Sequence, residues 1–478
     1  MSQVGWLRFA PPTKRGQIIY YNKVLPCVPV AFKMGEHIPE ITNFQILTTF
    51  LQNNPTIKFI QYQYLDYSSI LCTKFLTKTF ALTLASSNKP VTAPPFSTAA
   101  CLIDGSPAPE NWGTGEDQLW PDYSTLRVLH YLPGHASMTC HIHEGNLNEG
   151  ILGFARDPRH RLIQLLAEMQ EEQGVEVLVG HEIEFFICEQ PTVDAVPTKP
   201  VHTDKLTGAV SCTRNRYLPI LEEIVTVLMD SGIAVREFHA EGNSGFFEIS
   251  LDPLPPVESV DELMYARETI RSICSKHGLY ATMHPKPFER HAICGSHVHL
   301  SLSRKEPEIE DSFFAGVLRS WAGLAAVYMS NYDSYERVRE GEWVSWGWKS
   351  RNHGIRKINT AHWEFRHVDA TANGYMVLLG LISAGLMGLR ERLEMEIKDS
   401  KRWALEPVGW EEARELGYRD RMPQSLREAL DRLRVDCTLR EGLGVPMLER
   451  YVAMKIREAD NFKKMNWAER RNVSMRYF

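Results

Sequence analysis

The sequence predicts an α+β protein in which a small N-terminal domain precedes a larger domain of alternating helices and short strands. Segments rich in Ile, Val, Phe, Tyr and Thr dominate residues 58–84, which is typical of strands. Beyond residue 146, helix start and stop signals recur between short apolar segments. The chain has 478 residues, enough for two or three domains. We therefore expect an extension over residues 1–37, a small domain over 38–145 and a large domain over 146–478.

The extension is basic and contains no acidic residue before Glu36. Organellar targeting peptides share that composition, but Pro11, Pro12, Pro26 and Pro29 would break an amphipathic helix. The segment is thus a targeting peptide, an irregular extension, or the product of a start placed upstream of Met34.

In the small domain, residues 41–51 predict a helix, and residues 58–66 and 70–84 predict strands. Two stretches, 85–94 and 106–115, are expected to be loops because they are rich in Pro, Gly, Ser and Asn.

Four helices of the large domain have recognisable ends. Asp157-Pro158 begins a helix that Gly174 ends, and a strand follows over residues 182–187. Residues 217–229 form the next helix. Ser259 with Glu262, and Ser425 with Glu428, have the spacing of capping boxes.

Composition excludes several classes of protein. Hydrophobic residues make up 44% and charged residues 23%, and the net charge is −6, so the chain is neither disordered nor a generically basic nucleic-acid binder. The longest apolar run, residues 376–389, is shorter than the ~20 residues of a membrane span. Nine cysteines without regular spacing indicate a reducing compartment, so we expect a cytoplasmic protein with no membrane or nucleic-acid partner.

Four strand-like segments place ionisable residues among apolar neighbours. They are HEIEFFI with Glu182 and Glu184, AEGNSGFFEIS with Glu241 and Glu248, SHVHLSL with His297 and His299, and WEFRHV with Glu364 and Arg366. In a strand, residues i and i+2 point to the same face. Carboxylates crowded on one face repel each other unless cations separate them, and carboxylates with an occasional imidazole suit Mg²⁺ or Mn²⁺. The sequence therefore predicts a divalent-cation site suited to phosphoryl chemistry.

Four arginines follow within one stretch, and guanidinium groups bind phosphate and carboxylate bidentately. They are Arg337, Arg351, Arg356 and Arg366. No GxxxxGK[ST], GxGxxG or GxSxG motif is present. Each signal alone has an ordinary structural explanation: a solvated strand face, a core imidazole, or a hairpin turn in AEGNSGFFE. His141 and His143 have the same i, i+2 spacing, and we assign this pair a structural role.

The ordered motifs resemble those of the type-I glutamine synthetases and their γ-glutamylamide synthetase relatives, from about residue 64 to the C-terminus. The matching segments are GHEIEFF, EGNSGFFE, HGLYATMHPKP, CGSHVHLSL, SRNHGIR, WEFRHVDATANGY and MPQSLREAL, preceded by IDGSP and DQLWPDYSTLR. The resemblance implies a β-grasp-like N-terminal domain. It also implies a catalytic domain built on a curved antiparallel sheet, a half-barrel flanked by helices.

The resemblance also implies a role for each matching residue. Glu184, Glu241 and Glu248 would hold one Mg²⁺ or Mn²⁺, and Glu182, His297 and Glu364 another, in a site for two or three ions. His299 and Ser301 would line the ATP site, and Arg351 and Arg356 would contact the polyphosphate. Arg337 would bind the α-carboxylate of glutamate and Arg366 its γ-carboxylate. Asp104 would reach the site of an adjacent subunit, in a ring of ten or twelve, and Asp117 would lie on the same loop.

The implied reaction transfers the ATP γ-phosphoryl group to glutamate, giving γ-glutamyl phosphate, which ammonia or a small organic amine then attacks. The segment that would close over the amine departs from the family pattern and reads RVREGEWVS, where Glu342 or Glu340 would supply the second carboxylate. Trp343 in that segment would either bind an organic cation through its ring or only pack the segment against the sheet. A non-catalytic relative and another phosphotransferase, such as a guanidino kinase, are the alternatives.

Overall fold

The computed structural model describes residues 42–94, 102–107, 115–146, 150–190, 192, 195–202, 213–289, 293–401 and 408–478. Residues 43–478 form one compact unit, which is described below. The predictions made for residues 1–37 lie outside the described residues.

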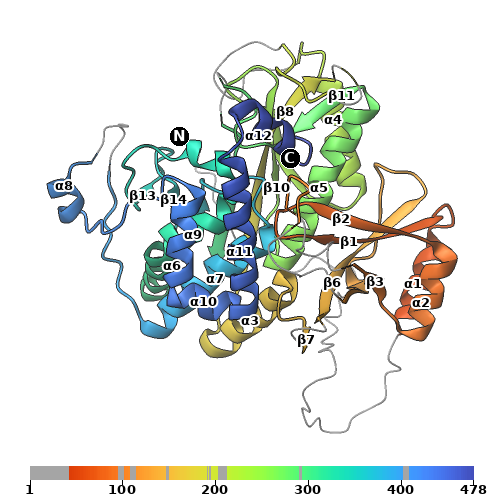
Figure 1. Cartoon of the computed structure of the whole chain (residues 1–478), viewed down its shortest axis with the longest axis horizontal. Helices are drawn as coiled ribbons and strands as arrows, with labels where there is room; N and C mark the ends of the chain where they lie inside the picture. Colours follow the sequence, from red (N-terminus) through yellow and green to blue (C-terminus); the bar gives the residue numbers. More distant parts are fainter. Residues whose placement is uncertain are drawn as a thin grey trace, which may run out of the picture. The chain divides into compact units, whose positions relative to one another are not determined.

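The first sheet occupies the small N-terminal part, where the order of its main strands is β2-β1-β6-β4-β3. Its strands are β1 (Phe59–Leu65), β2 (Leu71–Thr77), β3 (Val91–Ala93), β4 (Glu116–Pro121), β5 (Arg127–Val128), β6 (His135–Asn146) and β7 (Gly150–Gly153), with the short helix η2 (Tyr123–Thr125). Helices α1 (Asn43–Asn53) and α2 (Lys78–Ser87) pack on β1, where Leu47 and Leu84 share a core with Ile60 and Tyr62 (Figure 1). Because β7 pairs with β6, this sheet extends a few residues past the predicted boundary at 145/146.

Three expectations for this part were wrong. The stretch 85–94 is not a loop throughout, because α2 continues to Ser87 and Val91–Ala93 form β3. Residues 70–84 are not one strand, because β2 ends at Thr77, whose side chain accepts a hydrogen bond from the Phe80 backbone and thereby caps α2. The β-branched and aromatic content of the segment concealed this helix start. Asp117 does not lie on the Asp104 loop; it is buried within β4, paired opposite Glu144 of β6.

The second sheet is a curled half-barrel that carries the predicted polar segments, so the predicted α+β fold class is confirmed. Its order is β13-β14-β15-β12-β8-β10-β9, with β11 also paired to β8. The strands are β8 (Val177–Glu189), β9 (Val235–Ala240), β10 (Phe246–Leu251), β11 (Leu279–Thr282), β12 (Val298–Leu302), β13 (Trp346–Trp348), β14 (Ile355–Asn359) and β15 (His362–Phe365). The pairs are antiparallel except β13 with β14. The β-grasp description of the first sheet remains a prediction.

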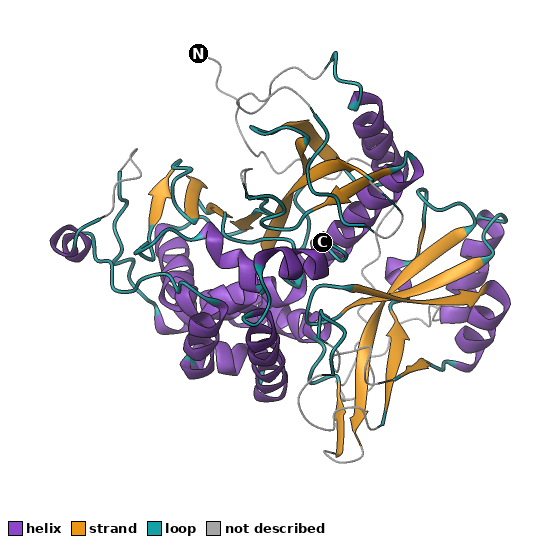
Figure 2. Cartoon of the chain, turned by 45° about the horizontal axis from the view of Figure 1, so that its top comes forward, coloured by secondary structure: helices purple, strands orange, loops and turns teal. Residues whose placement is uncertain are grey.

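Helices pack around this sheet and against one another (Figure 2). They are α3 (Pro158–Gln173), α4 (Leu218–Asp230), α5 (Pro256–Lys276), α6 (Pro307–Tyr328), η3 (Tyr332–Arg337), α7 (Gly374–Glu391), α8 (Trp410–Glu415), α9 (Leu426–Val435), α10 (Cys437–Leu443), α11 (Val445–Phe462) and α12 (Trp467–Ser474). In the described residues, α7 is the one helix long and apolar enough to cross a membrane, and 83% of it is buried inside the protein. It packs on α6, where a Cβ at Gly388 would overlap the Ser312 carbonyl and lie 3.0 Å from the Gly316 Cα.

The predicted helix ends are partly confirmed. Asp157 caps α3, Gly174 ends it in the left-handed conformation, and Ser425 caps α9. Ser259 does not begin a helix: α5 already starts at Pro256, and the Ser259 hydroxyl donates back to the Pro256 carbonyl at 2.8 Å. Proline at the first helical position, with its preset φ angle, explains the earlier start.

A buried ionic network joins the first sheet to the helices of the large part. Arg159 of α3 donates to Asp261 of α5 and to Asp122 before η2, both at 2.9 Å. It also contacts His141 of β6 at 3.0 Å, and His141 in turn bonds Asp157 at 3.0 Å. This confirms the structural assignment of His141. We call Arg159, Asp122, His141 and Asp261 the junction network.

Candidate active site

The strands of the second sheet bring the predicted ligand residues onto one face. Glu248 of β10 pairs opposite Glu184 of β8, and His299 of β12 pairs opposite Glu364 of β15. Because β8 lies between β10 and β12, Glu182 and Glu184 stand at the centre of the cluster. The same-face argument from the i, i+2 spacing is therefore confirmed.

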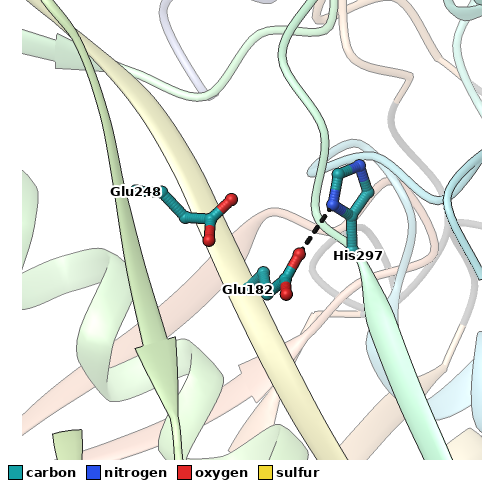
Figure 3. A group of neighbouring side chains, drawn as sticks. All are labelled: Glu182, Glu248 and His297. Atoms are coloured by element: carbon teal, nitrogen blue, oxygen red, sulfur yellow. Dashed lines mark hydrogen bonds and ion pairs between the residues drawn. The ribbon is translucent and has the colours of Figure 1, made fainter. Parts of the chain in front are cut away.

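Glu182 is the hub of this arrangement. Its two carboxylate oxygens lie 2.9 Å from His297 Nδ1 and 3.0 Å from His299 Nε2. Figure 3 shows the Glu248 carboxylate and the His297 ring directed toward Glu182 from the neighbouring strands. His297 Nε2 also lies 3.7 Å from a Glu184 oxygen, and its Nδ1 lies 3.7 Å from a Glu364 oxygen.

Three overlapping groups have donor atoms within 4.8 Å of one another, close enough to share a metal ion. They are Glu182, Glu248 and His297; Glu182, His299 and Glu364; and His239, Glu241 and Glu248. Oxygen donors with imidazole are the ligand set of Mg²⁺ or Mn²⁺. The side chains therefore fit divalent cations.

Charge crowding shifts the pKa values of these groups. Burial by itself would raise the pKa of Glu182, but hydrogen bonds from His297 and His299 outweigh it and lower the pKa. Burial alone would lower the pKa of His297, but the charge of Glu184 and the bond to Glu182 raise it. Burial and the charges of Glu248 and Glu184 raise the pKa of Glu241. In the absence of a metal, Glu182 and His297 thus stabilise each other's charged forms.

Glu364 is fully buried and is neutralised by arginines. Arg356 lies 2.7 Å from one of its oxygens, and Arg366 contacts the other. Burial alone would raise the pKa of Glu364, but the charges of Arg366 and His297 lower it. Arg351, by contrast, is exposed and forms no ion pair with the acidic side chains of the described residues.

Arg337 and Glu184 are both bonded to the loop that precedes β12. Arg337 donates to the backbone carbonyls of Cys294 and Arg366, the latter at 2.7 Å. The Gly295 amide donates to the Glu184 carboxylate. Arg337 therefore ties the loop before His297 to the residue after β15 through its two Nη groups, while its buried Nε has no hydrogen-bond partner among the described residues.

Two residues that the sequence analysis missed belong to the cluster. His239 lies 3.4 Å from both Glu241 and Glu248, and the hydrogen bond that it donates to the Glu248 carboxylate raises its pKa to about 9. His362 Nε2 lies 3.0 Å from His299 Nδ1, and burial lowers the pKa of His362 to about 4. Each stands two residues before a predicted ligand, Glu241 or Glu364, so the i, i+2 rule could have found both.

Three further predicted residues, Ser301, Glu342 and Asp104, make contacts of their own. Ser301 of β12 pairs opposite His362 of β15. Glu342 is bonded to His367 at 3.3 Å and to the Arg339 amide at 3.1 Å. Asp104 makes its hydrogen bonds with Ser106 and with Asn461 of α11.

Of the two roles considered for Trp343, cation binding and packing, the contacts of its side chain favour packing. It is buried against Ala413 and Tyr418, and its indole N–H donates to the Val408 carbonyl at 3.0 Å. The Arg421 guanidinium lies over its ring, 4.3 Å from the centroid. An organic amine would have to displace that arginine to reach the ring, so the cation-binding alternative for Trp343 loses its support.

Comparisons with known proteins agree with this geometry. The family model for the glutamine synthetase catalytic domain matches residues 155–472. The chain is 31% identical to protein fluG of Emericella nidulans over 91% of its own length but only 50% of that protein, so it spans half of this relative. It is 30% identical to the glutamine synthetase of Methanocaldococcus jannaschii, over 72% of this chain and 80% of that enzyme.

Solved structures share the fold. The apo structure of GmaS superposes with a TM-score of 0.74 at 21% identity, over 88% of this chain and 97% of that one. A protein described as a novel glutamine synthase homolog gives a TM-score of 0.71 at 20% identity, over 88% and 97%. The family model, the curated relatives and the metal-compatible sheet face lead to one conclusion: the chain belongs to the glutamine synthetase family.

Proposed function

We propose that this protein is an ATP-dependent ligase that joins the γ-carboxylate of glutamate to ammonia or a small primary amine. The observation that carries the proposal is the cluster of five carboxylates and their imidazole partners on one face of the second sheet. Family membership supplies the reaction class, since glutamine synthetases use ATP and divalent metals.

In this proposal, Glu184, Glu241 and Glu248 hold one divalent ion, and Glu182, His297 and Glu364 hold another. The ions would neutralise the charge of the ATP phosphates and the glutamate carboxylate. His299 and Ser301 line the nucleotide site, Arg351 and Arg356 bind the polyphosphate, and Arg366 orients the γ-carboxylate. Arg337 binds the α-carboxylate through N–H donors that the two backbone carbonyls leave unused.

The product of the first step, γ-glutamyl phosphate, is an activated acyl group that an amine attacks and from which phosphate leaves. Asp104 of a neighbouring copy removes the amine proton, and Glu342 provides the second carboxylate of the amine pocket. Both roles require a closed assembly of subunits, so we include a ring of ten or twelve copies in the proposal. A monomer would hold an incomplete site.

The alternative of a non-catalytic relative is less well supported. Such a protein has no need to keep metal ligands, yet all six predicted ligand side chains are present and lie on the shared sheet face or at its edge.

Phosphate release from ATP tests the proposal. We expect release to require glutamate, Mg²⁺ or Mn²⁺ and an amine together, across a panel of ammonium, methylamine, ethanolamine and polyamines. A hundredfold preference in kcat/KM, about 2.7 kcal/mol, identifies the acceptor. Absence of amine-dependent release across the whole panel would refute the ligase assignment.

A further inference from the structure

The turn that carries Asp104 is fixed to the C-terminal helix α11. Ile103, next to Asp104, is 2% exposed and packs with Phe462 of α11 and with Phe478. The turn closes on itself, because the Leu102 amide donates to the Ser106 carbonyl at 2.9 Å. A rigid helix therefore supports the backbone on which Asp104 stands.

The Asp104 carboxylate is held by three hydrogen bonds. Its Oδ1 accepts from the Ser106 amide at 2.9 Å and from the Ser106 hydroxyl at 2.6 Å. Its Oδ2 accepts from the side-chain amide of Asn461 at 3.1 Å, and that same amide donates to the Ser106 hydroxyl at 3.2 Å. A carboxylate has about four lone-pair positions. Among the described residues, these bonds leave one such position, on Oδ2, for a substrate proton.

Helix α11 is itself well anchored. Lys455 and Glu458, 2% and 1% exposed, form an ion pair at 3.2 Å, and both contact Ser68 in the turn after β1. Tyr451 donates to the Ala326 carbonyl at 2.6 Å. The helix thus contacts two separate turns of the small N-terminal part, one through the buried Lys455 and Glu458 and the other through the half-buried Asn461.

We propose that Asn461 is a positioning residue for the amine-dependent step, acting by orienting the Asp104 carboxylate. This inference rests on the proposed function, in which Asp104 accepts the amine proton. Asn461 belongs to the same chain as Asp104, so α11 of one subunit would set the geometry of the amine site in its neighbour. Small errors in the position of a reacting group lower rates by about one to two orders of magnitude.

The test compares four variants of the full-length protein: Asn461→Leu, Asn461→Asp, Asp104→Asn and the control Asp460→Asn, an exposed position on the same helix. We expect Asn461→Leu to lower kcat/KM for the amine about ten- to hundredfold while KM for ATP and for glutamate stays unchanged. Asn461→Asp keeps the shape of the side chain but places a second carboxylate beside that of Asp104. Its kcat/KM for the amine should therefore fall further than that of Asn461→Leu. Asp460→Asn should match the wild type. Thermal melts establish that each variant is folded.

The outcomes separate the two claims. If the wild type is inactive with every amine, the ligase assignment fails; if Asp104→Asn is fully active, only the proton-accepting role of Asp104 fails. In either case the inference fails with it. If Asp104→Asn is impaired but both Asn461 variants keep the wild-type kcat/KM for the amine, the inference alone is overturned. The inference is also overturned if Asn461→Leu lowers kcat/KM for the amine and at the same time raises KM for ATP, glutamate and amine together. General loosening of the fold would explain that result.

Discussion

Arg159 at the centre of the junction network offers a sharp stability test. Its side chain is 4% exposed, and its guanidinium binds Asp261 and Asp122, whose side chains are 7% and 24% exposed. Burial would raise the pKa of Asp122, but the charge of Arg159 lowers it, so the ionised form of Asp122 depends on this arginine. Arg159→Met removes the cation while keeping most of the side-chain volume.

Breaking a buried ion pair from one side costs about 3–5 kcal/mol, because the remaining charge is left uncompensated. The partial exposure of Asp122 places the expected cost near the lower end of that range. With an unfolding entropy of about 2.1 cal/mol/K per residue, this lower-end cost corresponds to a loss of about 3 °C in Tm for a chain of 478 residues.

Differential scanning calorimetry of the metal-free protein measures this shift. Arg304→Met is the matched control, because Arg304 is 40% exposed and pairs with Glu306, 51% exposed, at 2.8 Å; such a surface pair contributes about 0–1 kcal/mol. Adding Asp261→Asn to Arg159→Met should restore part of the loss, since it removes the stranded charge. Equal shifts for Arg159→Met and Arg304→Met would refute the reasoning.

Three further predictions follow from the site, the helix packing and the assembly. Glu248→Gln should abolish binding of one of the two proposed ions, which lowers the Mn²⁺ stoichiometry in calorimetric titrations, and should abolish ligase activity while leaving the circular dichroism spectrum unchanged, because it removes a charged ligand from two of the overlapping groups. Gly388→Ala should destabilise the protein by about 1–3 kcal/mol through overpacking of α6 on α7, whereas Gly409→Ala, with no neighbour within 4 Å, should stay within about 0.5 kcal/mol of wild type. Sedimentation should show ten or twelve subunits in the active species.

Each of these has a clear contrary result. Near-normal turnover of Glu248→Gln at saturating Mg²⁺ would remove that residue from the metal site. Equal melting temperatures for the two glycine variants would mean that α6 and α7 separate at little cost. A fully active monomer would exclude the shared-site assembly.

The sequence could predict the site face because its signal is local. The i, i+2 spacing of charged residues in apolar strands puts side chains on one face whatever the strand order. Strand partners are not encoded locally, so the meeting of Glu248 with Glu184 across β10 and β8 was visible only in the fold. His239 and His362 carry the same local signal, since each stands two residues before a glutamate of the site, Glu241 or Glu364.

Other features depended on tertiary contacts. The ring of Trp343 is covered by Arg421, a residue far along the chain, and no local pattern indicates that contact. The helix start at Lys78 depends on one capping hydroxyl within a strand-like composition. The hydrogen bond from Asn461 to the Asp104 carboxylate joins positions 357 residues apart, so it could not be predicted from the local sequence around either residue.

The pairing of imidazoles with carboxylates on the sheet face has a thermodynamic consequence. The pKa of His239 is raised to about 9, so in the metal-free protein this imidazole carries a proton at neutral pH that offsets nearby glutamates, and the pKa of His297 is raised as well. The proton on His239 must leave when a divalent ion takes over the glutamates, because a ligating imidazole is neutral and a cation beside the site repels charge. Apparent ion affinity should therefore rise as pH rises toward 9. The heat of binding should also differ between buffers in proportion to their ionisation enthalpies, so calorimetry in two buffers counts the released protons directly.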